Sequence, residues 1–469
     1  MVSILGANSV SGGYEVSNSL RLNDGDTPKL AITPNASNRK TWTFSAWVKR
    51  SSLSSNQRIL SITGTNDFLL RFRGDDKLSF IDGSITSELI TATKVFRDTS
   101  AWYHIVIVLD TTQGTASNRA KLYVNGYQET DLVNNSGGSA AYPSQNADGL
   151  INSNVLHTVG CRDTSGTVDQ NVDGYLAEVH FIDGTAKSPT DFGEFDDNGV
   201  WIPKKYTGTY GTNGFFFEFK QTGTSQNSSG IGADTSGNDN HFAVTNLAGT
   251  DVTTDTCTNN FATLNPLYKQ GSPAFSEGNC KVVLSAGDGT QGAAGGIAPA
   301  NGKWYWEVKH VSSTQSSILV REASDREDYL SYYEGNYAGY EKLDGNQRVT
   351  GNTESTYGAA YANGDIVMVA LDMDNDRVYF GKNGSWNDGS GNADEANLND
   401  YVSLSGVVNG LAAVANGNAS ATATFEMNFG NPSFAISSSN ADANGYGNFE
   451  YSVPSGYYAL CTKNLAEFG

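Results

Sequence analysis

The sequence has few cysteines, a shortage of positive charge and no long hydrophobic run. Its four cysteines are spread over 469 residues, without the close spacing of a zinc site or of a disulfide-rich scaffold. We expect them to be buried thiols in a protein that is made in a reducing cytoplasm. Because no segment approaches the roughly 20 apolar residues of a membrane-spanning helix, the sequence predicts no membrane insertion.

Positive charge is scarce, since 30 Lys and Arg face 50 Asp and Glu and the net charge is −20. An acidic surface repels phosphate, so we expect no nucleic-acid partner. Aromatic residues make up 11% of the chain and charged residues only 17%, which excludes a disordered chain. The 52 glycines and the lack of helical periodicity exclude a helical bundle, and a mainly β protein remains.

Strand-like segments separated by turn signals fill the first half of the chain. Residues 41–48 (TWTFSAWV) alternate between apolar and other positions, which is typical of a strand with one buried face. Residues 102–109 (WYHIVIVL) are apolar enough for a central strand that is buried on both faces. Residues 121–126 (KLYVNG) end in Asn-Gly, the preferred pair for a tight hairpin turn, and residues 175–182 (YLAEVHFI) form another strand candidate.

The second half repeats this order of elements. Residues 303–308 (KWYWEV) and 365–371 (DIVMVAL) are strand candidates, and residues 377–384 (RVYFGKNG) again end in Asn-Gly. Many short strands with regular turns favour sheet-on-sheet packing. The fold class predicted from the sequence is therefore all-β, with two antiparallel β-sandwich (jelly-roll) domains in tandem.

The expected domains cover residues 1–200 and 271–469. Residues 201–270 are rich in Gly, Ser, Thr and Asn, yet they contain residues 215–219 (FFFEF), which are too apolar for a free linker. We interpret residues 201–270 as an inter-domain segment that adds at least one strand to a sheet.

The first half carries a family likeness. Residues 43–48, 102–106, 121–126 and 174–179 together resemble a LamG-like domain with the concanavalin-A-type jelly-roll fold. In the second half, residues 302–307, 364–367 and 378–384 resemble a SPRY domain. The resemblance implies one β-sandwich in each half of the chain.

The pairing of these two domains resembles virion proteins of tailed phages, in particular marine phages that infect cyanobacteria. Residues 4–8, 19–22, 39–44 and 234–241 strengthen that likeness. It implies a protein on the exterior of the virion, in a tail fibre or a head-decorating fibre, made in the host cytoplasm. The implied partners are other virion proteins and a host cell-surface glycan or receptor, and a homo-oligomer is expected, with a trimer as the usual state of such fibres.

Catalytic residues are not expected. Glucanases of this sandwich carry three alternating acids on one strand, so that two carboxylates flank the glycosidic bond. The best match is Glu178 with Asp183, but in a regular strand these two acids lie on opposite faces. The acids at 325–328 are expected in a loop, and no nucleophile-elbow motif occurs. We expect no enzyme, with a glycan-degrading depolymerase on the same scaffold as the alternative.

No cofactor is predicted, although the sequence leaves Ca²⁺ open. Asp372, Asp374 and Asp376 would place three oxygens along one loop, which suits a calcium ion. The alternative is a solvated hairpin turn, in which Asp is common. Weaker candidates of the same kind lie at Asp24 with Asp26 and in residues 234–240, and the five histidines show no metal-site spacing.

A binding surface is expected in the second half. The tyrosine-rich stretch with Gly, Asn and Glu between its aromatic residues resembles a recognition loop, and its tyrosines are Tyr329, Tyr332, Tyr333, Tyr337 and Tyr340. The alternative is that these tyrosines form ordinary strands that pack against a neighbouring subunit. Attachment to a host surface is the function expected from these features, with purely structural decoration of the capsid as a further alternative.

Overall fold

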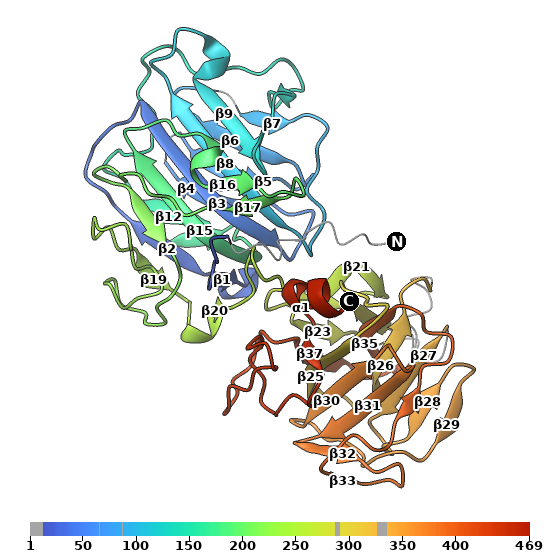
Figure 1. Cartoon of the computed structure of the whole chain (residues 1–469). Coiled ribbons are helices and arrows are strands. Elements are labelled where there is room, and N and C mark those ends of the chain that lie inside the picture. Colours follow the sequence, from blue (N-terminus) through green and yellow to red (C-terminus); the bar gives the residue numbers. More distant parts are fainter. Residues whose placement is uncertain (1–12, 65, 87, 287–290, 326–334) are drawn as a thin grey trace. The chain divides into compact units, whose positions relative to one another are not determined.

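The computed structural model describes residues 13–64, 66–86, 88–286, 291–325 and 335–469. The described chain divides into two compact units, residues 13–258 and Asn259–Gly469, and we call them the first and second domains. Figure 1 shows the first domain in blue to green and the second in yellow to red. Both are built from antiparallel sheets, which confirms the all-β sandwich prediction.

The first domain is a sandwich of two sheets whose strands differ in length. Sheet A has the strand order β10 (Tyr127–Gln128), β9 (Ala120–Val124), β8 (Trp102–Asp110), β3 (Thr41–Arg50), β15 (Gly174–Asp183), β1 (Ser19–Leu22) and β20 (Val252–Thr253), with β18 (Phe215–Phe217) also paired to β15. Sheet B has the order β11 (Leu132–Val133), β7 (Leu89–Thr91), β6 (Leu78–Asp82), β5 (Phe68–Phe72), β4 (Gln57–Ile62), β12 (His157–Val159), β2 (Lys29–Ile32) and β19 (Ala243–Thr245).

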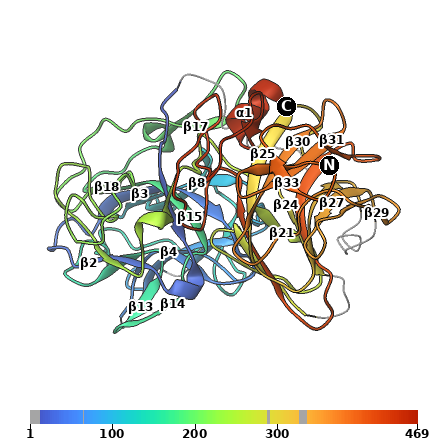
Figure 2. The same ribbon diagram turned by 90° about the horizontal axis from the view of Figure 1, so that it is seen from below.

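Short elements complete the first domain. They are the hairpin of β13 (Arg162–Thr164) and β14 (Thr167–Asp169), the hairpin of β16 (Gly193–Phe195) and β17 (Trp201–Pro203), and the 3-10 turns at Asp24–Asp26, Ala116–Asn118, Pro189–Asp191 and Gly249–Asp251. Seen from below in Figure 2, β13 and β14 lie at the edge of the first domain.

The main core of the first domain lies between the two sheets. Trp42, Phe44, Ala46 and Val48 alternate along β3 and all belong to one buried cluster with residues of sheet B. Burying alternate residues of a strand against a second sheet is the packing that the sequence pattern predicts. Trp42 makes edge-on ring contacts with Phe68, at a centroid distance of 5.6 Å.

The other face of sheet A is also covered. Trp47 of β3, Trp102 of β8 and Tyr175 of β15 belong to a second buried cluster, which contains Trp201 of the β16–β17 hairpin. The hairpin therefore lies over sheet A as a third layer, and we call it the covering hairpin. This explains why β8 is apolar on both faces.

The ends of the first domain are joined to each other. β1 near its start pairs with β20 near its end. Lys49 donates to the carboxylate of Asp255 at 2.8 Å, and both side chains are buried. Residues 201–258, including β18, β19 and β20, thus belong to the first domain, whereas the sequence suggested an inter-domain segment at 201–270.

The second domain is also a two-sheet sandwich. One sheet has the order β21 (Leu264–Gln270), β24 (Gln291–Gly295), β35 (Gly410–Asn416), β26 (Ser316–Glu322), β27 (Tyr337–Glu341), β28 (Gln347–Val349) and β29 (Thr353–Ser355). The other has the order β22 (Ala274–Ser276), β23 (Lys281–Leu284), β36 (Ala423–Asn428), β25 (Lys303–Ser312), β30 (Ile366–Asp372), β31 (Arg377–Lys382), β32 (Ser385–Asn387) and β33 (Ala393–Glu395), with β34 (Val402–Ser403) paired to β31 and β37 (Tyr458–Ala459) paired to β25. The chain ends in the helix α1 (Thr462–Phe468).

Trp304 and Trp306 of β25 fill the core between these two sheets. Both Asn-Gly turns predicted from the sequence are present: Asn125 and Gly126 have φ values of 49° and 81°, and Asn383 and Gly384 have values of 51° and 90°. Positive φ at both turn residues matches the twist of the flanking strands.

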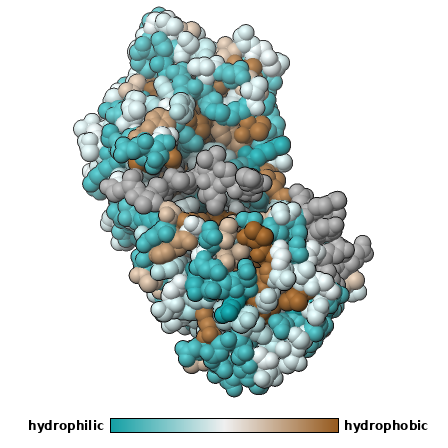
Figure 3. Space-filling view, turned by 45° about the vertical axis from the view of Figure 1, so that its right-hand side comes forward, coloured by the Kyte–Doolittle hydropathy of each residue, from teal (hydrophilic) through white to brown (hydrophobic). Residues whose placement is uncertain are grey.

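The surface is mixed in character. On the face that Figure 3 shows, hydrophilic residues predominate and hydrophobic ones gather in small separate areas. Among the residues that the structure places, no helix has the length and apolar character needed to cross a membrane.

Candidate functional site

A hollow with a volume of about 400 Å³ opens in the first domain beside β15 and β18, and we call it the Glu178 pocket. It lies next to the covering hairpin, since Lys205 and Tyr206 follow β17 directly. Its lining residues are Tyr14, Glu15, Ser17, Glu178, Lys205, Tyr206, Tyr210, Phe216, Glu218, Lys220 and Thr235.

A β-bulge in β15 places Glu178 in this pocket. The register between β15 and β3 shifts between Ala177 and His180, and Glu178 has a φ of 48°. Left-handed backbone in a residue other than glycine costs about 1–2 kcal/mol, and such strain concentrates at functional sites. The prediction that Glu178 and Asp183 lie on opposite faces assumed a regular strand, and the bulge makes that assumption wrong.

Glu178 is buried, at 5% exposure, yet it has few partners. Within the described residues, the Tyr14 hydroxyl donates to its Oε1 at 3.2 Å, and Nε2 of His180 lies 3.4 Å from its Oε2. By contrast, the buried carboxylate of Glu307 in the second domain accepts hydrogen bonds from four donors. A carboxylate has about four acceptor positions, so Glu178 retains acceptor capacity beside the cavity.

His180 connects Glu178 to the aromatic wall of the pocket. Its Nδ1 lies 2.9 Å from the Tyr210 hydroxyl, and its ring stacks on Phe216 with a centroid distance of 4.1 Å. Phe216 comes from β18, which pairs with β15 beside His180. The histidine therefore holds Tyr210 and Phe216 in fixed positions relative to Glu178.

The pocket tyrosines are hydrogen-bond donors at neutral pH. Burial, and then the neighbouring Glu178 carboxylate, raises the pKa of both Tyr14 and Tyr210 well above the usual value. Burial raises the pKa of Tyr206 to about 12, with a further contribution from Asp191. These phenols stay protonated, and their hydroxyl groups already bond within the protein: Tyr14 to Glu178, Tyr206 to the backbone carbonyl of Thr209 and Tyr210 to His180.

The charges of the pocket are unequal. Three of its lining residues are glutamates and two are lysines. Lys220 donates to Glu218 at 2.6 Å, so these two charges offset each other. Lys205 and Glu15 are both exposed and of opposite charge, so the buried Glu178 carries the remaining charge of the pocket.

A polar loop holds the pocket residues Tyr210 and Phe216. The Asp234 carboxylate accepts from the backbone N–H of Phe216 at 2.9 Å and from Ser236 and Asn240. The Asn238 and Asn240 side chains donate to backbone carbonyls of residues 211–214. These residues, weak calcium candidates in the sequence, act here as a clamp on the 210–216 segment.

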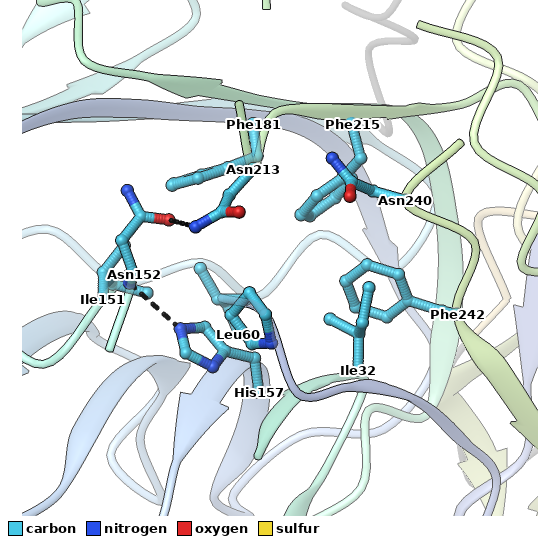
Figure 4. Close-up of a pocket in the computed structure, with 11 residues that line it drawn as sticks. Ile32, Leu60, Ile151, Asn152, His157, Phe181, Asn213, Phe215, Asn240 and Phe242 are labelled. Atoms are coloured by element: carbon cyan, nitrogen blue, oxygen red, sulfur yellow. Dashed lines mark hydrogen bonds between the residues drawn. The ribbon is translucent and has the colours of Figure 1, made fainter. Parts of the chain in front are cut away.

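Figure 4 shows a second, much smaller cavity, of about 20 Å³, in the core of the first domain. Its walls are mainly apolar rings such as Phe181, Phe215 and Phe242. Asn152 on its rim accepts from Asn213 at 3.2 Å and donates its backbone N–H to His157. This volume holds about one water molecule, so the cavity is a packing detail rather than a ligand site.

The tyrosines singled out in the sequence are not at this pocket. Tyr329, Tyr332 and Tyr333 lie outside the described residues. Tyr337 and Tyr340 lie in β27 with 0% exposure, and they pack into two different clusters of the second domain. Side chains buried in this way cannot stack on a ligand, so they form no part of the site.

Two of the three aspartates singled out for calcium bind other partners. Asp372 forms an ion pair with Lys303 at 3.0 Å and accepts from Asn375. Asp374 accepts a hydrogen bond from the backbone N–H of Gly302 at 2.8 Å. Asp376 has a φ of 54°, the left-handed conformation of a turn residue. Among the described residues, no group of three or more His, Cys, Asp or Glu side chains could hold a metal ion.

The Glu178 pocket could not be located from the sequence. Its one signal is that Glu178 is the only acidic residue in the mainly apolar segment 174–182, which also contains His180. The other lining residues come from segments far apart in the chain, and only the fold brings them together.

Comparison with known proteins gives matches to the fold. No curated protein sequence is significantly similar to this chain. Among solved structures, the SPRY domain of human HERC1 is 14% identical and matches 35% of this chain and 96% of its own, with a TM-score of 0.28.

A second solved structure is a putative carbohydrate-binding protein from Bacteroides ovatus. It is 18% identical, and the match covers 38% of this chain and 46% of that one, with a TM-score of 0.29. Glu178 lies inside the segment that a sequence-family model matches, and the covering hairpin follows that segment. Residues 24–191 of the chain match the Laminin_G_3 model, which describes the concanavalin A-like lectin/glucanases superfamily.

Proposed function

We propose that the first domain binds a saccharide in the Glu178 pocket. The observation that carries this proposal is the buried, under-bonded carboxylate of Glu178, held by a strained bulge and facing a cavity of about 400 Å³. Small-molecule sites have volumes of roughly 300–1,000 Å³ and combine apolar walls with a few placed polar groups.

The chemistry of the lining suits a sugar ring. Sugars present apolar C–H faces and hydroxyl groups, so they bind where aromatic rings lie beside hydrogen-bonding groups. Tyr206, Tyr210 and Phe216 supply the rings, and Glu178 supplies a strong acceptor. The match of residues 24–191 to a superfamily named for lectins and glucanases supports the same ligand class.

The test is a glycan panel that includes host envelope polysaccharides, with binding measured by calorimetry on the intact chain. Glu178→Gln keeps the shape of the side chain and removes its charge, and we expect it to weaken binding at least about tenfold. The control is Glu194→Gln, because Glu194 is exposed and pairs with the exposed Lys204, which follows the covering hairpin. Equal affinity of Glu178→Gln and the wild type would overturn the proposal.

Hydrolysis is the second candidate, because Glu218 lines the same pocket as Glu178. Two carboxylates that flank a glycosidic bond are the machinery of glycosidases. We propose binding without turnover, since Lys220 already pairs with Glu218. If the protein releases reducing sugar from a bound glycan and Glu178→Gln abolishes that release, hydrolysis would replace binding without turnover as the function of the pocket.

The sequence resemblance to phage virion proteins supports a wider proposal, in which this pocket contributes to attachment of a particle to its host. Many copies on one particle would turn weak single contacts into tight adhesion. Immunogold labelling of intact virions tests the location, and binding of the purified protein to host cells separates an adhesin from purely structural decoration.

A further inference from the structure

The interior of the Glu178 pocket combines a buried carboxylate, Glu178, with aromatic faces. Glu178 is 5% exposed and, in the part of the chain that is described, has a single hydrogen-bond donor in Tyr14. His180 lies 3.4 Å from its second oxygen and stacks on Phe216. Tyr206 and Tyr210 complete the wall, with their ring centroids 5.1 Å apart.

The lysines of the pocket do not neutralise Glu178. Lys220 bonds to Glu218 at 2.6 Å, and its side chain is about half exposed. Lys205 lies at the exposed rim. The chain as a whole carries a charge of −20, so the long-range field adds to the local one.

A carboxylate beside aromatic rings is an environment that favours an ammonium group. The ammonium has three N–H donors and no acceptor, so it can use the free acceptor positions of Glu178. The ring faces attract a cation through their quadrupoles, most strongly where water is excluded. A neutral hydroxyl group can donate a hydrogen bond to Glu178 but has no charge attraction to it, and an anionic sugar is repelled by the Glu178 carboxylate.

We propose that the Glu178 pocket selects a saccharide unit with a free ammonium group over the same unit in neutral or N-acetylated form. This inference rests on the proposed saccharide-binding function and adds the chemical class of the ligand. Glu178 receives the ammonium, and Tyr206, Tyr210 and Phe216 contact the ring that carries it.

The test compares three disaccharides with the same linkage: that of glucosamine, that of N-acetylglucosamine, and cellobiose. Calorimetry at pH 6.5 on the intact chain, in about 0.3 M salt to screen general attraction to the acidic surface, gives their affinities. We expect the glucosamine disaccharide to bind at least about tenfold more tightly than the other two. Glu178→Gln should remove this preference, and Glu194→Gln, which changes the net charge equally, should keep it.

A second variant guards against misfolding of Glu178→Gln. Lys220→Gln alters an exposed side chain and frees Glu218, so we expect it to strengthen the preference for the ammonium form several-fold. Its control is Lys204→Gln, because Lys204 is exposed and pairs with Glu194 outside the pocket. The control changes the net charge by the same amount and should leave the preference unchanged.

The outcomes separate this inference from the proposed function. Equal binding of the three disaccharides, all weakened by Glu178→Gln, would overturn the inference and leave saccharide binding in place. The glucosamine preference could instead persist in Glu178→Gln, or change equally in Lys220→Gln and Lys204→Gln. Either result would show that the preference comes from general attraction to the acidic surface, and it would overturn the inference. Failure of the glucosamine disaccharide to bind at millimolar concentration would also overturn it, while the glycan panel still decides saccharide binding.

Discussion

Trp201 donates its indole N–H to Nδ1 of His104 at 2.9 Å, across 97 residues of sequence. Because the indole is only a donor, Nδ1 of His104 is the acceptor, and the imidazole carries its proton on Nε2, 2.8 Å from Ser45. The His104 ring also stacks on Trp47 at a centroid distance of 4.9 Å, and the Trp201 ring lies nearly parallel to it at 5.9 Å. This contact fixes the covering hairpin to sheet A, and the hairpin in turn borders the Glu178 pocket.

Acid should destabilise the first domain through His104. Burial lowers the pKa of this residue to about 3 in the folded state, against 6.5 in its unperturbed form. Between pH 6.5 and 3, His104 is therefore protonated in the unfolded chain but neutral in the folded chain. The contribution of the neutral His104 to the free energy of unfolding is complete above pH 6.5, and it is lost as the pH falls toward 3. We expect His104 to account for a loss of about 2 kcal/mol at pH 5, measured by chemical denaturation as the difference between the wild type and His104→Gln. His104→Gln should reduce the pH dependence but not abolish it, because burial also lowers the pKa of His157, to about 4.

Gly193→Ala should loosen the covering hairpin. An added Cβ would lie 2.5 Å from the indole of Trp201, although the backbone of Gly193 suits any residue. The clash is steric, and we expect a loss of about 1–3 kcal/mol in the free energy of unfolding. A change in tryptophan fluorescence at neutral pH would report displacement of Trp201. Unchanged stability and fluorescence would show that the hairpin is not held through this contact.

The strain at Glu178 should be measurable as an inverted preference for glycine. Glycine in a strand usually costs about 0.5–1 kcal/mol relative to alanine. At a φ of 48°, however, alanine keeps the strain and glycine relieves it. We expect Glu178→Gly to be more stable than Glu178→Ala by about 1 kcal/mol in thermal or chemical unfolding, while neither variant binds saccharide. Greater stability of the alanine variant would mean that the bulge is unstrained.

Loss of the clamp should weaken binding without touching a residue of the pocket lining. Asp234→Ala removes the acceptor for Phe216, Ser236 and Asn240, so the 210–216 segment should loosen. We expect about 1–3 kcal/mol of destabilisation and a weaker saccharide affinity in calorimetry. Asp239→Asn is the control, because the Asp239 side chain is 89% exposed in the same loop and asparagine suits its φ of 60°. Similar effects of the two substitutions would contradict the clamp.

Chelation should leave the melting temperature of the second domain unchanged. Asp372 already binds Lys303, and Asp374 already accepts from Gly302, so their carboxylates do not converge on a common point. A ligand that binds only the native state raises its melting temperature, and removal of such a ligand lowers it. A lower melting temperature after chelation, restored by Ca²⁺ and absent in Asp372→Asn, would establish a calcium site there.

The sequence predicted best where local pattern and packing agree. The alternation of Trp42, Phe44, Ala46 and Val48 requires one buried face, and the structure has it. The Asn-Gly turns are similar, since their conformation depends on two residues alone. Tyr337 and Tyr340 mislead for the opposite reason. The Gly and Asn around them suggest a loop, but β27 pairs with strands on both edges and buries both tyrosines.

The Glu178 pocket escaped prediction because a bulge is a property of strand pairing. Nothing in residues 174–182 distinguishes a regular strand from one with an extra residue, so Glu178 was placed by simple alternation. Tyr14, Tyr210 and Phe216 reach it from other segments, and their approach depends on β18 joining β15. Long-range pairing of this kind leaves no periodic trace in the sequence.

The pairing of β1 with β20 and the Lys49–Asp255 contact have a consequence for synthesis on the ribosome. During synthesis, one edge of β1 stays unpaired and Lys49 lacks its partner until residue 255 has left the exit tunnel of the ribosome. In the second domain, Phe261 bridges to Cys461, so its first segment completes its pairing only after residue 461 has been synthesised. Each domain can therefore complete its fold only after its last segment has been synthesised. A nascent chain that is truncated inside a domain would leave the first strand or segment of that domain without its partner.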